Sequence, residues 1–124
     1  MIGSATAAGA ASGPEATVER LRASRDVRAV FADRRAAATP VAVLHARLRG
    51  DDAPPRVAVV AGKAVGNAVQ RNRVKRRLRA ATPALGLRRG ADYVIIGRAA
   101  ALTTPFNELR AALSRSAAAV WNRR

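Results

Sequence analysis

The chain has 124 residues, enough for one domain, and 23 Lys or Arg against 8 Asp or Glu give it a formal net charge of +15. It has no cysteine, which excludes disulfides and thiolate ligands, and no apolar run long enough to span a bilayer. Such a surface is expected to bind a polyanion, nucleic acid above all, in a cytoplasmic protein without a membrane partner.

The first segment, residues 1–17, is rich in Ala, Gly and Ser and has no periodic apolar face. We expect it to be a disordered extension, because it cannot bury enough apolar surface to order itself. It also lacks the basic start and the apolar core of a signal peptide. Residues 18–124 are predicted to fold as a single domain.

The first element expected in that domain is a short helix. Val27, Val30 and Phe31 follow the i, i+3, i+4 spacing of one apolar helix face. Ser24 stands where a side-chain cap is favoured.

Two strands are predicted next. Residues 40–49 alternate, with one face formed by Ala42, Leu44, Ala46 and Leu48. Residues 56–61 form a second apolar run, rich in valine. The segment between them, Asp51–Pro55, has the composition of a solvated turn, so we expect the two strands to pair as a hairpin.

A strongly basic helix is expected to follow. Six of the nine residues from Arg71 to Arg79 are cationic and none is acidic. Asn67 is a plausible N-cap, and Val74, Leu78 and Ala81 fall within one narrow sector of the helix. The helix therefore has a thin apolar seam and a broad cationic surface, which is typical of contact with protein on one side and phosphate on others.

The last part of the chain predicts a strand and a closing helix. Residues 91–97 are the most apolar and β-branched run, which indicates a central strand. Thr104 and Pro105 are expected to start a helix whose core stripe is Phe106, Leu109, Leu113, Ala117 and Val120. The predicted fold is α+β, a small two-layer sandwich of order α-β-β-(β)-α-β-α, with helices on one mostly antiparallel sheet and one short strand unplaced.

No active site carried by the protein itself is predicted, and no metal ligands. The only histidine, His45, has no second His or Cys to share a metal. Asp51 and Asp52 lie in a turn with basic neighbours, and the serines have no base in a recognisable motif. Any reaction would therefore depend on a partner.

The segment from Lys63 to Arg79 resembles the signature of the bacterial ribonuclease P protein subunit, K-x-V-G-N-A-V-x-R-N-R-x-K-R. The Gly-Asn turn and the Arg-Asn-Arg triplet stand in the same register, which makes the match more specific than a basic run. A weaker similarity extends upstream over Leu21–Phe31 and downstream through Asp92 to the closing helix.

This resemblance implies a function and several partners. The family's protein binds the catalytic RNA and the 5′ leader of precursor tRNA, and assists endonucleolytic removal of that leader. The hydrolysis itself is expected in the RNA subunit with its bound Mg²⁺, with no metal held by protein ligands and no obligate protein partner. For the fold, the resemblance implies that the basic helix lies in a left-handed βαβ crossover.

Position by position, the resemblance assigns RNA contacts to Lys63, Asn67, Arg71, Asn72, Arg73, Lys75, Arg76 and Arg79. It assigns Phe31 and His45 to a leader cleft between the first helix, the sheet and the basic helix. Two alternatives stay open at this point: Asn72 either bonds to RNA or braces its helix, and Phe31 either lines the cleft or packs in the core.

The chain also departs from the family pattern. Val27 stands where the family usually has Phe, Ala64 replaces the second Lys of a common pair, and Arg34 replaces the Gly that ends the first helix. In the second strand Ala58 and Val60 replace Gly and Ser or Thr. We therefore expect the leader to be held more by charge than by aromatic stacking.

Three other functions are compatible with a strongly basic chain. A ribosomal or general structured-RNA-binding protein without a role in tRNA processing would share the basicity but has no need of the Gly-Asn register. A cationic module at anionic membranes needs a hydrophobic opposite face. A protein-only nuclease needs clustered carboxylates for metals, and the acidic residues here are scattered.

Overall fold

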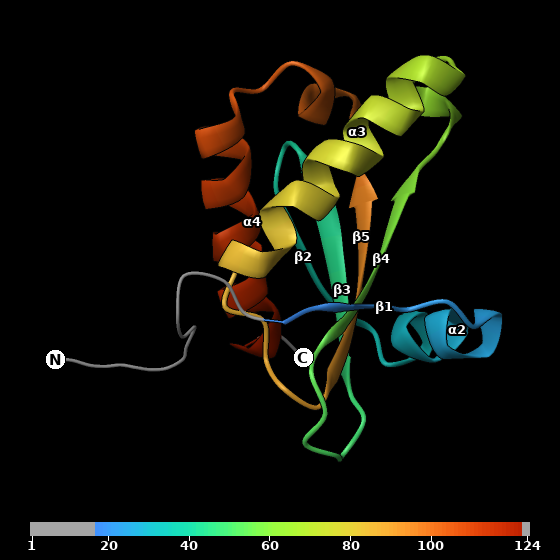
Figure 1. Cartoon of the computed structure of the whole chain (residues 1–124), viewed down its shortest axis with the longest axis vertical. Helices are drawn as coiled ribbons and strands as arrows, with labels where there is room; N and C mark the ends of the chain where they lie inside the picture. Colours follow the sequence, from blue (N-terminus) through green and yellow to red (C-terminus); the bar gives the residue numbers. More distant parts are fainter. Residues whose placement is uncertain (1–16, 123–124) are drawn as a thin grey trace, which may run out of the picture.

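The computed structural model describes residues 17–122. Over this part of the chain the strands and helices are β1 (Glu19–Arg20), α2 (Ser24–Ala32), β2 (Arg35–Ala38), β3 (Ala42–Leu48), β4 (Arg56–Ala61), α3 (Ala68–Ala81), β5 (Ala91–Gly97) and α4 (Phe106–Ala119) (Figure 1). Short 3-10 turns are η1 (Lys63–Val65), η2 (Thr82–Ala84), η3 (Ala99–Leu102) and η4 (Val120–Asn122). Apart from its last position, the expected N-terminal extension lies outside the described residues.

The strands form one mixed sheet of order β1-β4-β5-β3-β2. The predicted hairpin of β3 and β4 is wrong, because β5 lies between them, antiparallel to β3 and parallel to β4. The physical reason is burial: β5 is almost entirely buried, and only the central position covers it on both sides. Its central place was predicted correctly from its apolar sequence.

Two edge strands complete the sheet. β2 pairs antiparallel with β3 and was not located from the sequence, since its Arg-Ala-Ala-Ala run has no β-branched residue. β1 pairs parallel with β4 over two residues. Two pairings are therefore parallel and two antiparallel among the described strands, so the expected mostly antiparallel sheet was also wrong.

The main core lies between one face of the sheet and helices α3 and α4. Leu44 and Ile95 of the sheet pack with Val74 and Leu78 of α3 and Leu113 of α4. The predicted seam of α3 is thus confirmed as its buried side.

Gly97 at the end of β5 permits this close packing. A Cβ at that position would lie 2.6 Å from Val74 Cγ1 and 3.1 Å from Leu78 Cδ1. Any side chain there would push α3 away from the sheet.

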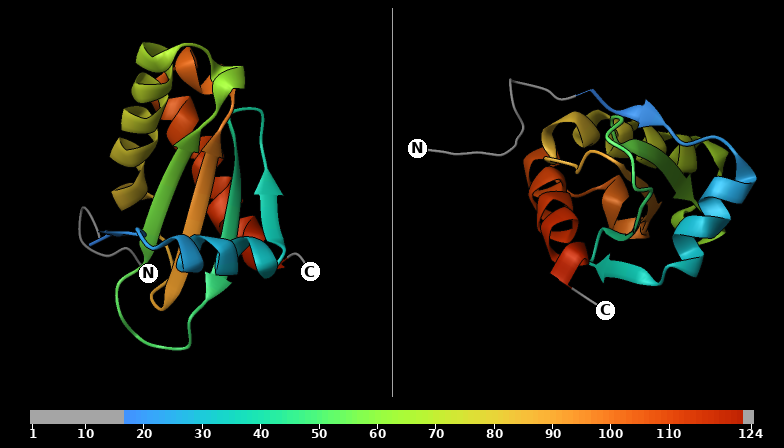
Figure 2. Two further views of the ribbon diagram at one scale, coloured as in Figure 1. Left: turned by 90° about the vertical axis from the view of Figure 1, so that its right-hand side faces the viewer. Right: turned by 90° about the horizontal axis from the view of Figure 1, so that it is seen from below.

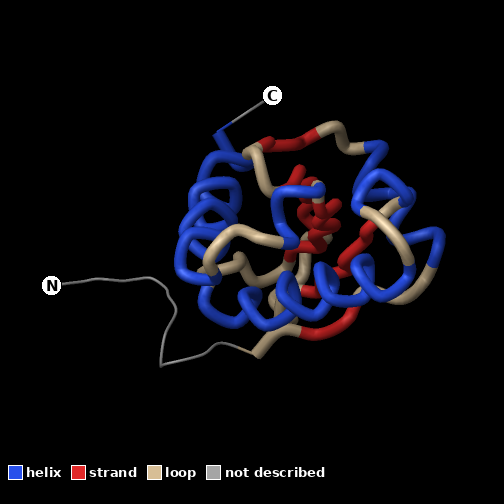
Figure 3. The backbone as a smooth tube through the Cα atoms, turned by 90° about the horizontal axis from the view of Figure 1, so that it is seen from above, coloured by secondary structure: helices blue, strands red, loops and turns tan. Residues whose placement is uncertain are grey.

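Helix α2 covers the opposite face of the sheet, so the fold has a third, partial layer (Figures 2 and 3). The small cluster beneath it consists of Leu21, Val30 and Val94, with Val27 and Ile96 packed against them. In the left view of Figure 2, α2 crosses the lower half of this face and leaves the upper half open.

The connection from β4 through α3 to β5 is a parallel crossover. In the left view of Figure 2 both strands run upward, β5 lies to the right of β4, and α3 lies on the face away from α2. That arrangement is a left-handed crossover, which is uncommon for such units.

Helix starts differ from prediction in local detail. Ser24 is the first residue of α2, and its N-cap Ala23 makes no side-chain bond. Pro105, rather than Thr104, caps α4, because the Thr104 hydroxyl donates to the Ala100 carbonyl. Phe106 is 38% exposed instead of packing in the core stripe.

Candidate nucleic-acid interface

The start of α3 is held by a reciprocal pair of hydrogen bonds. The backbone N–H of Gln70 donates to Asn67 Oδ1, and the Asn67 N–H donates to Gln70 Oε1, both at 2.9 Å. This capping box confirms the predicted N-cap and satisfies two free N–H groups at the helix end. Asn67 was predicted to contact RNA, but its side-chain oxygen accepts a hydrogen bond from the first turn of the helix.

Gly66 makes that box possible. Its φ of +146° lies in the region that side chains rarely adopt, and a Cβ would lie 2.0 Å from Gln70 Oε1. The Gly-Asn turn thus fixes where the helix begins and in which direction it projects.

The cations of α3 lie outside its buried seam. Arg73, Arg76 and Arg79 are exposed, whereas Arg71 and Lys75 are half-buried. The exposed Lys63 precedes them in η1. Asn72 is exposed and its side chain makes no hydrogen bond within residues 17–122, so it does not brace the helix there.

Over the part of the chain that the structure describes, these cations have no carboxylate partners. Among the described residues, no ion pair within 4.0 Å involves Lys63 or any basic residue of α3. Arg77, which was not predicted to bind RNA, instead donates to the carbonyls of Ala101 and Thr104 and ties α3 to the turn before α4. What remains is an open cationic surface, the arrangement that neutralises phosphates and releases their counterions.

Phe31 and His45 meet on the other face of the sheet. Their rings are in edge contact, with centroids 4.8 Å apart and planes at 70°. Phe31 is 40% exposed, which decides against a core role. Burial lowers the pKa of His45, and its Nδ1 is buried without a hydrogen-bond partner in the described part of the chain. Burial therefore favours the neutral form of His45 beside Phe31.

An apolar strip continues from these rings along the sheet. Val43 and Val60 are both register partners of Ile96, so the three side chains lie side by side on the face that α2 leaves open. This strip was not predicted from the sequence, although the alternation of side chains along each strand was its signal. Helix α3 packs on the opposite face, so it does not line the surface that holds Phe31 and His45.

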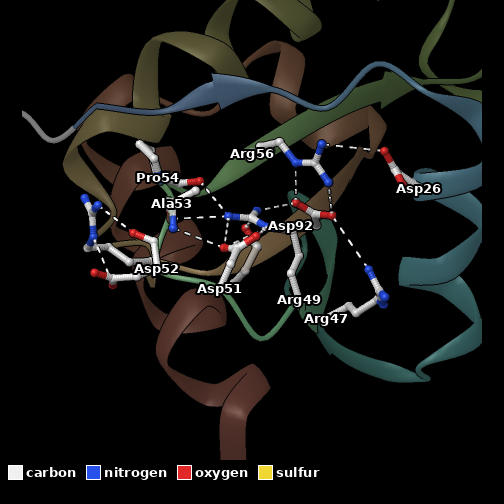
Figure 4. A network of polar contacts seen from close by, with 11 residues as sticks. Asp26, Arg47, Arg49, Asp51, Asp52, Ala53, Pro54, Arg56 and Asp92 are labelled. Atoms are coloured by element: carbon white, nitrogen blue, oxygen red, sulfur yellow. Dashed lines mark hydrogen bonds and ion pairs between the residues drawn. The ribbon is translucent and has the colours of Figure 1, made fainter.

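A buried carboxylate beneath α2 was also missed. Asp92 has no exposed surface, yet it accepts bonds from Arg49 Nη1 at 2.6 Å and from Arg56 Nε and Nη2 at 2.8 and 2.7 Å (Figure 4). Arg47 lies 3.9 Å away. The signal in the sequence was an acid inside the most apolar strand, since a buried charge requires partners.

Arg56 links this carboxylate to helix α2. Its Nη1 lies 3.5 Å from Asp26 Oδ2, while its other nitrogens hold Asp92. Its hydrogen bond with Asp92 raises the pKa of Arg56. One guanidinium thus connects the helix that carries Phe31 to the central strand.

Arg49 organises the loop before β4. It donates to Asp51 and to the carbonyls of Ala53 and Pro54. The hydrogen bond from Arg49 lowers the pKa of Asp51 from 3.8 to about 2. The predicted solvated turn is therefore exposed but held in place by an arginine.

These features define a class of protein, an α+β domain as expected of an RNA-binding protein. On one side lies a cationic helix whose basic side chains have no carboxylate partner among the described residues. On the other side is an open face with rings and aliphatic side chains. The model of the family Ribonuclease P matches residues 16–120. The chain belongs to this family.

Relatives agree with that assignment. The ribonuclease P protein component of Symbiobacterium thermophilum is 43% identical over 73% of this chain and 81% of its own length. That of Streptococcus pyogenes is 36% identical over 73% and 76%.

Solved structures show the same fold. The RNase P protein of Thermotoga maritima has a TM-score of 0.65 at 27% identity, covering 78% of this chain and 96% of its own. The protein of Staphylococcus aureus has a TM-score of 0.67 at 20% identity over 81% and 93%.

Within residues 17–122, none of the helices has the length and hydrophobicity of a membrane-spanning segment. No three His, Cys, Asp or Glu side chains of this part gather where they could hold a metal ion.

Proposed function

We propose that this chain acts as the protein subunit of ribonuclease P and holds the catalytic RNA with the cationic surface of α3. The observation that carries this proposal is that a capping box fixes the start of the helix, while its cations have no carboxylate partner among residues 17–122. A fixed row of guanidinium groups suits the regular spacing of phosphates in folded RNA.

The open face of the sheet is proposed to receive the 5′ leader of precursor tRNA. Phe31 and His45 offer the ring surfaces, and the strip of Val43, Val60 and Ile96 offers apolar contact only. Stacking area is therefore small, while α2 carries two exposed arginines nearby, Arg25 and Arg28. We propose that charge supplies most of the leader affinity.

The hydrolysis is assigned, as part of the proposal, to the RNA subunit and the Mg²⁺ it binds. The side chains of the described residues bring no metal-binding group together, which supports a positioning role for this chain. The protein would bind the RNA, orient the leader and lower the Mg²⁺ concentration that the reaction requires.

The test is reconstitution with a bacterial ribonuclease P RNA at low Mg²⁺. Wild-type protein should raise 5′-leader removal from a precursor tRNA over RNA alone. The double variant Arg73→Ala/Arg76→Ala should lose most of this increase. A matched control, Arg110→Ala/Arg115→Ala, removes the same charge from exposed positions of α4 and should keep it.

Two results would contradict the proposal. One is that folded wild-type protein gives no increase in cleavage. The other is tight binding to ribosomal RNA with none to ribonuclease P RNA, which would favour a general RNA-binding protein.

A further inference from the structure

A pocket lies between the β1 edge of the sheet and the C-terminal end of α3. Its lining consists of Val18, Glu19, Arg20, Val57, Arg79, Thr82 and Pro83. Of these residues only Arg79 belongs to the family signature, and Arg20 is contributed by a strand far away in the sequence. The pocket is therefore separate from both the exposed middle of α3 and the open face under α2.

The backbone aims Arg20 at this pocket. β1 is held on β4 by the bonds Glu19 N–H to Pro55 O at 2.9 Å and Leu21 N–H to Val57 O at 3.0 Å. Val18 packs on the main core, while Leu21 lies in the cluster under α2. Because side chains alternate along a strand, Arg20 shares the side of Val18, where α3 lies.

Arg20 and Arg79 therefore both line this pocket, and both are exposed residues. The pKa of Arg79 is lowered, first by burial and then by the positive charge of Arg20. Glu19 is the acid of the lining, but within residues 17–122 no carboxylate lies within 4.0 Å of Arg20 or Arg79. Two neighbouring cations repel each other, and a bound anion would relieve this repulsion.

One carbonyl oxygen at the C-terminal end of α3 is already hydrogen-bonded within the protein. The carbonyl of Arg79 accepts the Thr82 hydroxyl at 2.9 Å and the Thr82 backbone N–H. The Thr82 hydroxyl already donates its hydrogen bond within the protein. The guanidinium groups of Arg20 and Arg79 are therefore the side-chain donors that a ligand could use. Val18, Val57 and Pro83 form the apolar part of the wall, where charge-assisted bonds are stronger than in water.

We propose that this pocket binds a phosphate group between Arg20 and Arg79. The shared chemistry is a tetrahedral oxyanion, which either an RNA backbone or free inorganic phosphate supplies. As an RNA contact, the proposal rests on the proposed function and extends its cationic surface around the end of α3 onto β1. As a phosphate site of the free protein, it stands independently of that function.

The first arm of the test measures thermal unfolding of the full chain in phosphate and in chloride at equal ionic strength. Phosphate should stabilise the wild type, and Arg20→Ala should weaken phosphate binding about tenfold, as expected for the loss of one charge-assisted contact. Arg22→Ala, an exposed arginine outside the pocket, is the matched control and should respond like the wild type. In chloride, Arg20→Ala should melt at or above the wild-type temperature, because it removes a repulsion.

The second arm measures binding to ribonuclease P RNA as a function of salt. If the phosphate comes from RNA, Arg20→Ala should reduce the slope of log affinity against log salt concentration by about one. Arg22→Ala should leave that slope unchanged. Loss of the phosphate response with an unchanged salt slope would assign the site to free phosphate.

The proposed site would be refuted if phosphate stabilised Arg20→Ala as much as it stabilises Arg22→Ala. It would also be refuted if phosphate stabilised Arg79→Gln as much as Arg22→Ala. This outcome differs from failure of the proposed function, in which wild-type protein does not stimulate cleavage but still responds to phosphate through Arg20. The circular dichroism spectrum in chloride establishes that each variant is folded before either arm is read.

Discussion

The buried carboxylate of Asp92 offers the sharpest test of how this small domain is held together. Replacing it with asparagine keeps the size of the side chain and removes its charge. Arg56 would lose a two-bond contact at 2.8 and 2.7 Å, and Arg49 a contact at 2.6 Å. The amide NH₂ of the new residue would also face guanidinium N–H groups, placing donor against donor.

The expected cost follows from burial. Asp92 is completely buried, and removing one partner of a buried ion pair costs about 3–5 kcal/mol. A domain of this kind is stable by about 5–15 kcal/mol, so Asp92→Asn should lose a large part of the free energy of unfolding. Asp52→Asn is the control, since Asp52 is 94% exposed and its pair with Arg89 is a surface contact worth about 0–1 kcal/mol.

Urea denaturation at neutral pH, followed by circular dichroism, measures both variants. Asp92→Asn should shift the midpoint strongly without changing the slope with denaturant, whereas Asp52→Asn should leave the midpoint nearly in place. Leader binding should weaken as well in Asp92→Asn, because Arg56 also contacts Asp26 on α2. A loss below about 1 kcal/mol in Asp92→Asn would refute the reasoning, since it would mean that the arginines find solvent as readily as the carboxylate.

Four further predictions follow from single contacts. Asn67→Ala should lower the free energy of unfolding by about 1 kcal/mol in urea titrations, because the capping box of α3 is lost; no change would contradict its role. Arg34→Gly should raise the free energy of unfolding by about 1 kcal/mol, because Arg34 has a φ of +64°, a left-handed conformation that glycine adopts without strain. A lower free energy of unfolding in this variant would show that the Arg34 side chain stabilises the fold by more than the backbone strain costs. The pKa of Asp51 is about 2 in the folded protein against an ordinary value of 3.8, so its stabilisation is present above about pH 4 and is lost as the pH falls through 2. Asp51→Asn should therefore flatten the dependence of the melting temperature on pH over that window. An unchanged pH dependence in the variant would contradict this prediction. Arg73→Ala should reduce the salt slope of RNA binding by about one while Arg110→Ala does not, and equal slopes for both would place the RNA elsewhere.

The basic helix shows how much local sequence can predict. Its N-cap at Asn67 and its seam of Val74, Leu78 and Ala81 depend on residues within a few positions of one another. Capping and helical periodicity are short-range effects, so they survive whatever surrounds the helix. The open cationic surface followed from the lack of acids nearby in the sequence, and the structure brought none in from elsewhere among the described residues.

The sheet shows the opposite case. β3 and β4 are adjacent in sequence and have a turn between them, yet β5 separates them. Strand order is settled by which arrangement buries the most apolar strand, and that competition involves segments far apart in the chain. The placement of α2 on the second face was equally beyond local pattern, because Val27 and Val30 would suit either face.

By itself, the sequence determined the family, the cationic helix with its cap and buried seam, and the central place of β5, because these depend on residue identity and on spacing over a turn or two. Only the tertiary structure decided the strand order, the partners of Asp92, the ring contact of Phe31 with His45, and the placement of Arg20 and Arg79 in one pocket. Each of those joins side chains from separate elements, and their contacts are set by how the layers pack together.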